Sequence, residues 1–137
     1  MIDETHRADL RSWVDSANDP ATDFPIQNLP YGVFRRRADG ATKPTIGVAI
    51  GELVLDLAMI EEQGLLAPAS LRGQRVFDQP VLNPFMAAGR AAWRETRQML
   101  TRLLSAEEST LRDNTKLRDR ALVPMRDVEM LLPARIG

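Results

Sequence analysis

Large hydrophobic residues alternate with small or polar ones along two neighbouring stretches of the chain, Thr45–Ile50 and Leu53–Leu57. This period of two predicts a pair of β-strands. Gly51 and the residue after it give the two-residue spacing of a tight β-hairpin, where glycine adopts positive φ at little steric cost. Because a one-residue slip would expose every large side chain, the alternation also specifies the register of the hairpin. The small residues Gly47 and Ala49 leave the opposite face of the first strand uncrowded.

A third strand is predicted just before this hairpin, within the segment Asp23–Arg36. Pro25 and Pro30 hold the residues before them extended and remove two backbone donors, which suits a chain that enters the edge of a sheet. Tyr31–Arg36 then has the aromatic and β-branched composition of a strand, and Gly32 marks a point where a neighbouring group approaches closely. We expect the rest of the chain to close on this strand.

Helical patterns follow the strands in two places. The first, Asp56–Gln63, predicts a short helix that Asp56 caps and Gly64 ends. The second predicts a long amphipathic helix at about 84–104, because asparagine followed by proline is favoured at a helix start and the hydrophobic residues after it recur with helical period. The stripe expected to be buried consists of Phe85, Met86, Gly89, Ala92, Trp93, Met99, Leu100, Leu103 and Leu104.

The last part of the chain is predicted to hold one more helical segment and two extended pieces. Ser105–Glu108 has the spacing of a capping box, so a new helix is expected to begin at Ser105. Asp113-Asn114 is expected to divide that helix. The stretches 121–123 and 128–132 are predicted to return as strands that pair with the early ones. The fold class is therefore α+β, mainly a β-sheet with accompanying helices.

Residues 1–22 are predicted to form an N-terminal arm that precedes the domain proper at 23–137. The arm is polar, and Trp13 is its main hydrophobic anchor. Asp9–Val14 has the pattern of a helical turn, and 16–23 is typical of a loop. Two interpretations stay open from the residues alone: Trp13 holds the arm against the domain, or the terminus is frayed.

Composition limits the class of protein more than it identifies a function. The chain has 137 residues, enough for one domain with a hydrophobic core. Its 18 basic and 19 acidic side chains leave a formal charge of −1, which argues against a dedicated nucleic-acid binder. It contains no cysteine, so disulfides and thiolate metal sites are excluded and a cytoplasmic location is expected. The pattern also predicts neither a signal peptide nor a membrane-spanning segment.

The residues that could carry chemistry do not form a catalytic pattern. His6 is the only histidine and lies in the arm, where a base or metal ligand would have no fixed partners. Arg35–Arg37 is interpreted as a solvated strand end, since no aromatic platform for nucleic acid surrounds it. Glu61-Glu62 and Glu107-Glu108 are adjacent on predicted helices, so each pair diverges. Asp15, Asp19 and Asp23 are assigned to solvation and capping. We therefore predict no catalytic, cofactor-binding or metal-binding residue in this chain.

Several spaced motifs nevertheless give the chain a close resemblance to the N-terminal part of the fumarylacetoacetase family, from Ser12 onward. In chain order these motifs are Asp23–Phe34, Ile46–Gly51, Leu55–Leu57, Phe77–Pro80, Leu82-Asn83, Phe85-Met86, Gly89–Trp93, Leu111–Asp113 and Leu132–Gly137. The resemblance implies that residues 23–137 form a small SH3-like β-barrel with helices. It also implies that the chain stops at a domain boundary and lacks a larger, catalytic C-terminal domain.

The resemblance implies a function for the parent protein. Such enzymes hydrolyse a carbon–carbon bond of 4-fumarylacetoacetate, giving fumarate and acetoacetate in tyrosine and phenylalanine catabolism; a related acylpyruvate substrate stays open. A calcium or magnesium ion and a histidine with a carboxylate partner carry the reaction, and the parent is expected to be a homodimer. None of these metal-binding or catalytic residues has a counterpart in this chain, which is expected to be inert alone and to pack on the catalytic domain.

One alternative is kept open beside this reading. The chain could be a stand-alone small β-barrel that binds a peptide or protein partner. Its groove would lie around Tyr31, Phe34 and Trp13, although these residues are more simply explained as core.

Overall fold

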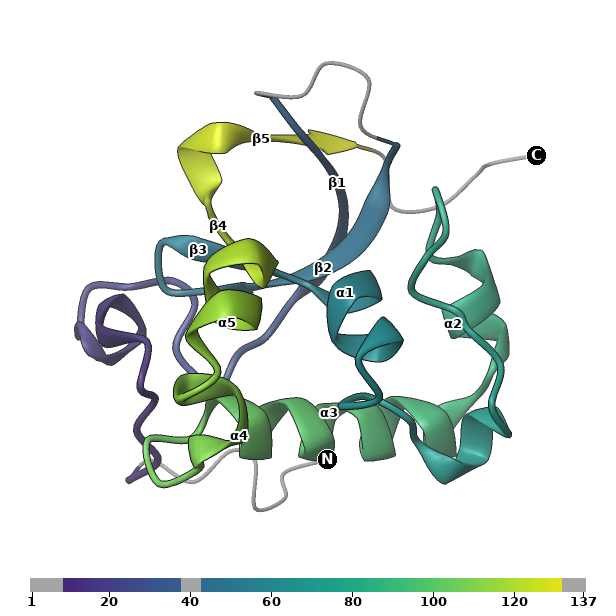
Figure 1. Ribbon diagram of the computed structural model, residues 1–137, viewed down its shortest axis with the longest axis horizontal. Coiled ribbons are helices and arrows are strands. Elements are labelled where there is room, and N and C mark those ends of the chain that lie inside the picture. Colours follow the sequence, from purple (N-terminus) through teal and green to yellow (C-terminus); the bar gives the residue numbers. More distant parts are fainter. Residues whose placement is uncertain (1–8, 38–42, 132–137) are drawn as a thin grey trace.

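The computed structural model describes residues 9–37 and 43–131 of the chain. Its centre is a five-stranded antiparallel sheet with the strand order β4-β3-β2-β1-β5 (Figure 1). The strands are β1 (Tyr31–Arg36), β2 (Thr45–Ile50), β3 (Leu53–Asp56), β4 (Leu122–Pro124) and β5 (Val128–Leu131). The helices are α1 (Leu57–Glu62), α2 (Asn83–Ala87), α3 (Arg90–Leu104), α4 (Ser109–Arg112) and α5 (Thr115–Ala121). The α+β class is thus confirmed, as a curled sheet with helices.

The predicted hairpin is confirmed in both position and register. Ile50 pairs with Leu53, Val48 pairs with Leu55, and Gly51 adopts a φ of 58° in the turn between them. The strand predicted before the hairpin also has the expected bounds, and Gly32 of β1 pairs directly with Gly47 of β2. The alternation of large and small side chains, together with the composition of β1, therefore predicts the three central strands of the sheet correctly.

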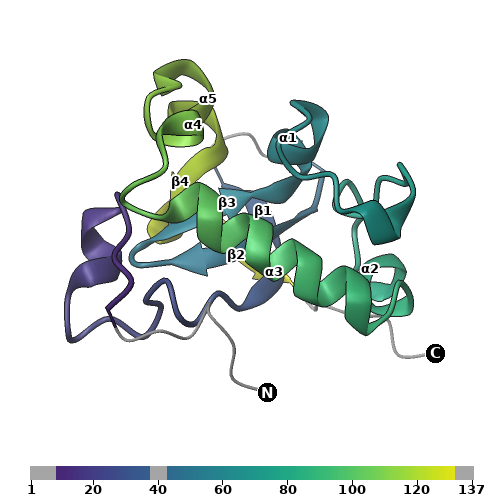
Figure 2. The same cartoon turned by 90° about the horizontal axis from the view of Figure 1, so that it is seen from below.

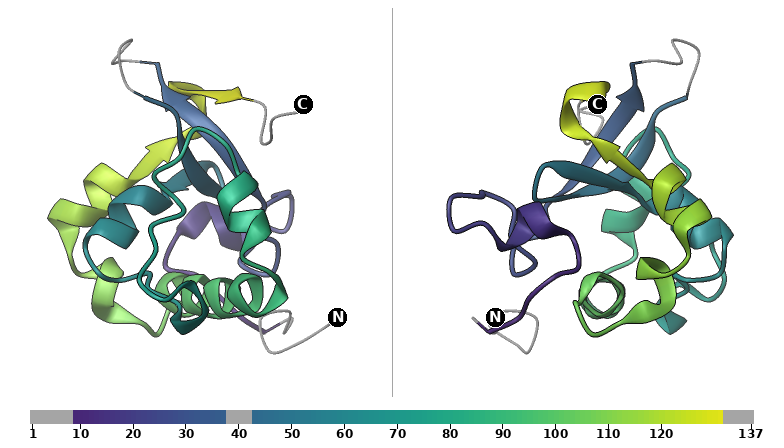
Figure 3. Two further views of the ribbon diagram at one scale, coloured as in Figure 1. Left: turned by 90° about the vertical axis from the view of Figure 1, so that its right-hand side faces the viewer. Right: turned by 60° about the vertical axis from the view of Figure 1, so that its left-hand side comes forward.

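The two faces of the sheet have different surroundings. Helices α1, α3, α4 and α5 lie on one side of the sheet, with α3 running across it (Figures 1 and 2). The main core fills this side and includes Val33, Val48 and Leu55 of the strands. On the other, concave side, β4, the 3₁₀ helix Met125–Asp127 and β5 curl over the sheet (Figure 3).

Helix α1 forms for the predicted reasons. The Asp56 carboxylate accepts a hydrogen bond from the Met59 backbone amide at 3.3 Å and so caps the helix. At the other end, Gly64 has a φ of 77°, and the Leu65 amide reaches back to the Ile60 carbonyl at 3.1 Å. This left-handed ending satisfies carbonyls that would otherwise lack partners. In the loop after it, Val76 and Phe77 are buried.

The single long helix predicted at about 84–104 is wrong, because the structure divides it into α2 and α3. Gly89 separates the two with a φ of 91° and ψ of 174°, a backbone conformation that is nearly exclusive to glycine. The break turns α2 out of line with α3, so Met86 is 53% exposed and Trp93 is 39% exposed rather than buried. The Trp93 indole donates to the Phe85 carbonyl at 2.9 Å and bridges the elbow.

The predicted helix start at Ser105 is also wrong. Ser105 is the C-cap that follows α3, and α4 begins only after Glu108, whose carboxylate accepts from the Thr110 amide at 3.4 Å. The cap lies three residues later than predicted, at Glu108 instead of Ser105, because both residues offer a side-chain oxygen to a free helix amide. The predicted division at Asp113-Asn114 is confirmed, since the Asn114 side chain caps α5.

The N-terminal segment runs along α3 and the β2–β3 hairpin (Figure 3). The Trp13 indole donates to the Leu103 carbonyl at 2.7 Å, and the Ser12 hydroxyl donates to the Leu104 carbonyl at 2.6 Å. Of the two readings left open for this segment, the contacts support a segment held in place over residues 9–22. The helical turn expected at 9–14 is wrong, because the one helical turn here is a 3₁₀ helix at Asp15–Asn18.

The two late strands pair with early ones, as we predict from the sequence. Val54 of β3 pairs with Val123 of β4, and Phe34 of β1 pairs with Met130 of β5. Residue 132, which we expected to extend β5, lies outside the described residues. Across 9–37 and 43–131, no helix has the length and hydrophobicity to span a membrane.

Candidate functional site

The most distinctive surface of the molecule is the concave face of the sheet, where small residues form the floor. Gly32 and Gly47 are cross-strand partners at its centre. Ala49 lies on the same side of β2, because alternate residues of a strand point to the same face. Val54 is the cross-strand partner of Ala49 and forms one wall. Gly32, Gly47 and Ala49 together leave space on this face that larger residues at the same positions would fill.

That space is an apolar hollow of about 310 Å³. Its lining consists of Phe24, Pro30, Tyr31, Gly32, Phe34, Gly47, Val48, Ala49, Val54, Met125, Val128 and Met130. The Tyr31 side chain points to the opposite face of β1, where its ring packs 5.0 Å from that of Phe85, and burial there raises the pKa of its phenol far above its usual value. Met130 is 59% exposed at the rim. The hollow thus offers hydrophobic contact and no charge.

The two glycines of the floor allow close approach by side chains. A Cβ atom on Gly47 would lie 2.7 Å from Phe34 Cε1 and 2.7 Å from Val54 Cγ1, so glycine lets these side chains fill the base of the hollow. A Cβ atom on Gly32 would lie 2.8 Å from the Met130 methyl. Gly47 thus serves packing within the sheet, whereas Gly51 serves the hairpin turn.

The basic run Arg35–Arg37 has the solvent exposure that we expect of a strand end, since Arg37 is exposed and the other two are partly exposed, but its side chains are also bonded within the structure. Arg35 pairs with Glu129 of β5 at 2.6 Å, and the Arg37 guanidinium donates to the Val128 carbonyl at 2.9 Å. Arg36 pairs with Asp56 at 3.0 Å and donates to the Arg120 carbonyl at 2.9 Å. These side chains fasten β1 to its neighbours, so they form no phosphate-binding patch.

Asp56 is the buried acidic group of the described chain, at 5% exposure. Burial raises the pKa of its carboxyl group, while the Arg36 guanidinium and the backbone amide of Met59 oppose that rise. The carboxylate therefore serves one structural junction where β3, α1 and β1 meet. Because both of its oxygens are engaged, it is not poised to act as a general base.

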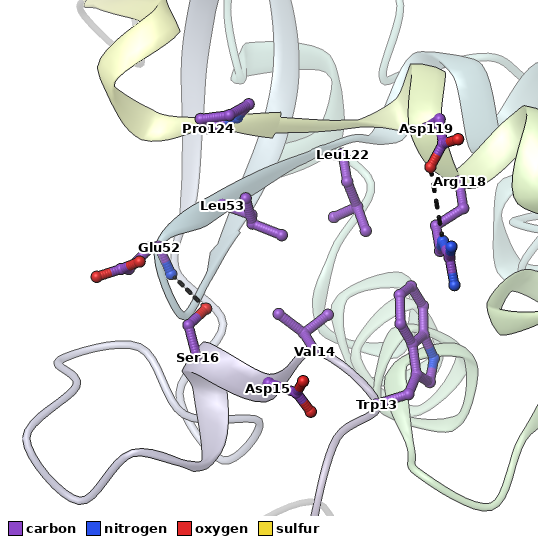
Figure 4. Close-up of a pocket in the computed structure, with 10 residues that line it drawn as sticks. All are labelled: Trp13, Val14, Asp15, Ser16, Glu52, Leu53, Arg118, Asp119, Leu122 and Pro124. Atoms are coloured by element: carbon purple, nitrogen blue, oxygen red, sulfur yellow. Dashed lines mark hydrogen bonds and ion pairs between the residues drawn. The ribbon is translucent and has the colours of Figure 1, made fainter.

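A second hollow, of about 590 Å³, lies between the N-terminal segment, the β2–β3 turn and α5 (Figure 4). Arg118 lies 6.0 Å from the centre of the Trp13 ring and 3.8 Å from the Asp119 carboxylate. The Ser16 hydroxyl accepts from the Glu52 amide at 2.9 Å. The contacts of Trp13 and Ser16 join the N-terminal segment to the rest of the domain, so this hollow marks the interface between the two. Tyr31 and Phe34 line the other hollow, so the three aromatic residues proposed for one groove do not meet.

The remaining acidic candidates have structural roles or stay apart. Glu61 accepts from the Val76 amide at 3.2 Å, and burial raises the pKa of its carboxyl group. Glu108 caps α4, and Asp19 accepts from the Ala21 amide at 2.9 Å. Among the residues that the structure describes, no three acidic, histidine or cysteine side chains are grouped as metal ligands. His6 lies outside the described residues.

The residues that line the apolar hollow determine what it can bind. It can bind apolar side chains or an apolar ligand, and it presents no nucleophile with an adjacent base. The sequence did not predict the hollow, although the alternation of Gly47 and Ala49 with large residues in β2 was its signal. The missing information was that Gly32 of β1 would pair opposite Gly47.

Comparison with known proteins gives a consistent set of relatives. The family described as fumarylacetoacetase N-terminal matches residues 27–133. The fumarylacetoacetase of Oryza sativa subsp. japonica is 48% identical over 135 residues, which are 98% of this chain and 31% of that protein. The fumarylacetoacetase of Homo sapiens is 48% identical over 126 residues, which are 92% of this chain and 29% of that protein. The fumarylacetoacetase of Bos taurus is 50% identical over 127 residues. The chain thus spans less than a third of the length of these relatives.

Proposed function

Because the chain belongs to the fumarylacetoacetase N-terminal family, we propose that it is the non-catalytic N-terminal domain of a fumarylacetoacetase. The parent enzyme would hydrolyse a carbon–carbon bond of 4-fumarylacetoacetate, giving fumarate and acetoacetate in tyrosine and phenylalanine catabolism. The observation that carries this proposal is the family match across residues 27–133, at 48% identity to relatives that are more than three times as long.

The chemistry is proposed to lie in the part of the relatives that this chain does not cover. Asp56, Glu61 and Glu108 hold backbone amides, and Glu129 pairs with Arg35. The described residues therefore offer no fitting site for the calcium or magnesium ion expected in the parent, and we assign none of them a step in the reaction.

The role proposed for this domain is structural. It would pack on the catalytic domain and order the region around the active-site mouth, within a cytoplasmic parent that forms a homodimer. We further propose that the curled sheet is an SH3-like β-barrel. The strand order β4-β3-β2-β1-β5 and the 3₁₀ helix that joins β4 to β5 support this finer assignment.

The proposal is tested by assaying loss of fumarylacetoacetate absorbance with the full-length protein and with residues 1–137, each with calcium or magnesium added. We expect turnover by the full-length protein and none by residues 1–137. Turnover by residues 1–137 would show that a catalytic centre lies in this chain. If the full-length protein did not turn over fumarylacetoacetate but cleaved another acylpyruvate, the proposed substrate would be wrong and the reaction class would stand.

A second candidate function is a small module that binds a peptide or protein partner, and the apolar hollow favours it. Titration of residues 1–137 with proline-rich peptides and with oligonucleotides separates the two candidates. Saturable peptide binding would support the module. If neither peptides nor oligonucleotides bind, the module is excluded and the structural role within fumarylacetoacetase stands.

A further inference from the structure

We propose that the apolar hollow on the concave face of the sheet is the docking surface for the downstream part of the same polypeptide, with Met130 at its rim as a direct contact. This inference rests on the proposed function, because it names the surface through which the N-terminal domain meets the catalytic one. The occupant would be an apolar segment that places one or two hydrophobic side chains in the hollow beside Met130, because Met130, Phe34 and Val54 already cover the floor at Gly32 and Gly47.

The chemistry of the hollow selects an apolar occupant. Its lining carries no charged side chain, and its volume of about 310 Å³ is at the lower end of the range of small-molecule pockets. Fully desolvated pockets of this kind receive the anchor residues that dominate binding energy in protein interfaces. Methionine side chains line it at Met125 and Met130, and methionine adapts its shape to a partner. A charged ligand would lose its hydration there without a compensating partner.

Exposure at the rim indicates that the hollow is not closed by the described residues. Among residues 9–37 and 43–131, three large hydrophobic side chains are exposed, and Met130 is the most exposed of them at 59%, against 53% for Met86 and 39% for Trp93. Trp93 donates its indole N–H to the Phe85 carbonyl and so has a role within the domain. Met130 contacts the Gly32 position and lies on β5, the end strand of the sheet. End strands offer unpaired backbone groups that proteins commonly cover.

The length of the relatives and the direction of the chain identify the occupant. In the relatives, the region matched here is the N-terminal part and covers 29–31% of their length, so more than two thirds of such a protein follows it. Met130 is next to Leu131, the last residue of β5. In the full-length protein proposed above, a segment that follows β5 would start next to Met130, at the rim of the hollow. Attachment at that point gives a downstream segment a high effective concentration over the hollow, and a separate partner lacks this advantage.

The experiment compares two substitutions in the full-length protein, Met130→Lys and Met86→Lys. Both residues are exposed methionines in the described domain, so both variants are expected to fold, and only Met130 lines the hollow. Three properties are measured for each: the thermal unfolding curve, the rate of limited proteolysis between the two domains, and the mass in solution by light scattering. Native mass spectrometry of the full-length protein reports any bound small molecule.

We expect Met130→Lys to separate the unfolding curve into two transitions. Cleavage between the domains should become about tenfold faster, because proteolysis follows the population of the open form. Met86→Lys should behave as the unsubstituted protein does, and neither variant should change the solution mass.

Three results would each overturn the proposal. In the first, Met130→Lys leaves unfolding and cleavage unchanged, or Met86→Lys produces the same changes. In the second, Met130→Lys halves the solution mass without separating the transitions, which would assign the hollow to a second copy of the chain. In the third, an apolar small molecule accompanies the full-length protein and is lost in Met130→Lys. If deleting residues 1–137 still impairs the enzyme, the proposed function survives any of these failures.

Discussion

Gly47 shows how a single residue sets the shape of the concave face. Phe34 and Val54 reach to within 2.7 Å of the position that a Cβ atom would occupy there, so only glycine lets both side chains lie at the base of the hollow. Gly32 lies opposite in the sheet, but its close neighbour is the flexible end of Met130. The two positions therefore look equivalent in sequence and differ in what surrounds them.

Replacing each glycine by alanine tests this difference. Gly47→Ala should lower the free energy of unfolding of the chain by about 1–3 kcal/mol, because two packed side chains and the Leu55 carbonyl must move. Gly32→Ala should have a smaller effect, because the Met130 methyl can turn aside. Urea denaturation of both variants measures the two losses. Equal losses would show that the base of the hollow is no more tightly packed than its rim.

Asp56 provides a test that depends on pH. Burial raises the pKa of its carboxyl group in the folded chain, so between the ordinary and the raised values the folded state binds a proton that the unfolded state has released. The stability that Asp56 contributes is thus present below its ordinary pKa and lost as the pH rises through the raised one. Asparagine can still cap α1 but does not titrate.

The chain with Asp56 should therefore lose stability relative to Asp56→Asn as the pH rises from about 3 to 7, an interval that spans the ordinary carboxyl pKa near 4. Unfolding free energies of the two proteins at matched pH values give the difference directly. If the unsubstituted chain instead became more stable than Asp56→Asn as the pH rises, the ion pair with Arg36 would outweigh the effect of burial on the Asp56 carboxyl group.

At the scale of elements, the sequence predicted those strands and helices whose bounds depend on neighbouring residues. The hairpin follows from alternation and Gly51, and α1 follows from the Asp56 cap and Gly64. The α2–α3 elbow was missed because Gly89 falls on the hydrophobic stripe, where a helical glycine and a helix-breaking glycine look alike in sequence. Its backbone angles decide the matter, and these depend on how α2 packs against Tyr31 and Phe77 through Phe85.

Gly89→Ala tests whether the elbow is fixed by backbone conformation. No atom lies within 4 Å of the added Cβ, so any loss comes from the positive φ and not from crowding. We expect the free energy of unfolding to fall by about 1–3 kcal/mol, the usual strain of such a conformation. Circular dichroism should show no gain in helix. A more helical and more stable variant would mean that α2 and α3 prefer to run on as one helix.

At the scale of the whole molecule, the two faces of the sheet are packed differently. The helices complete the main core on one face, while the other face has a smaller buried cluster, formed by Phe34, Val54, Val123 and Val128, beside the apolar hollow. Sequence reasoning anticipated the strands on both sides and the family, because these follow from local pattern and motif order. It missed the hollow, because a concave surface depends on which strands become neighbours across long sequence separations, as β1 and β5 do.

The measurement that tests the central claim most directly is removal of residues 1–137 from the full-length protein. If this domain packs on the catalytic one and orders its mouth, the remainder should show a lower Tm and a changed kcat or KM for fumarylacetoacetate. An unchanged Tm together with unchanged kcat and KM would contradict the account.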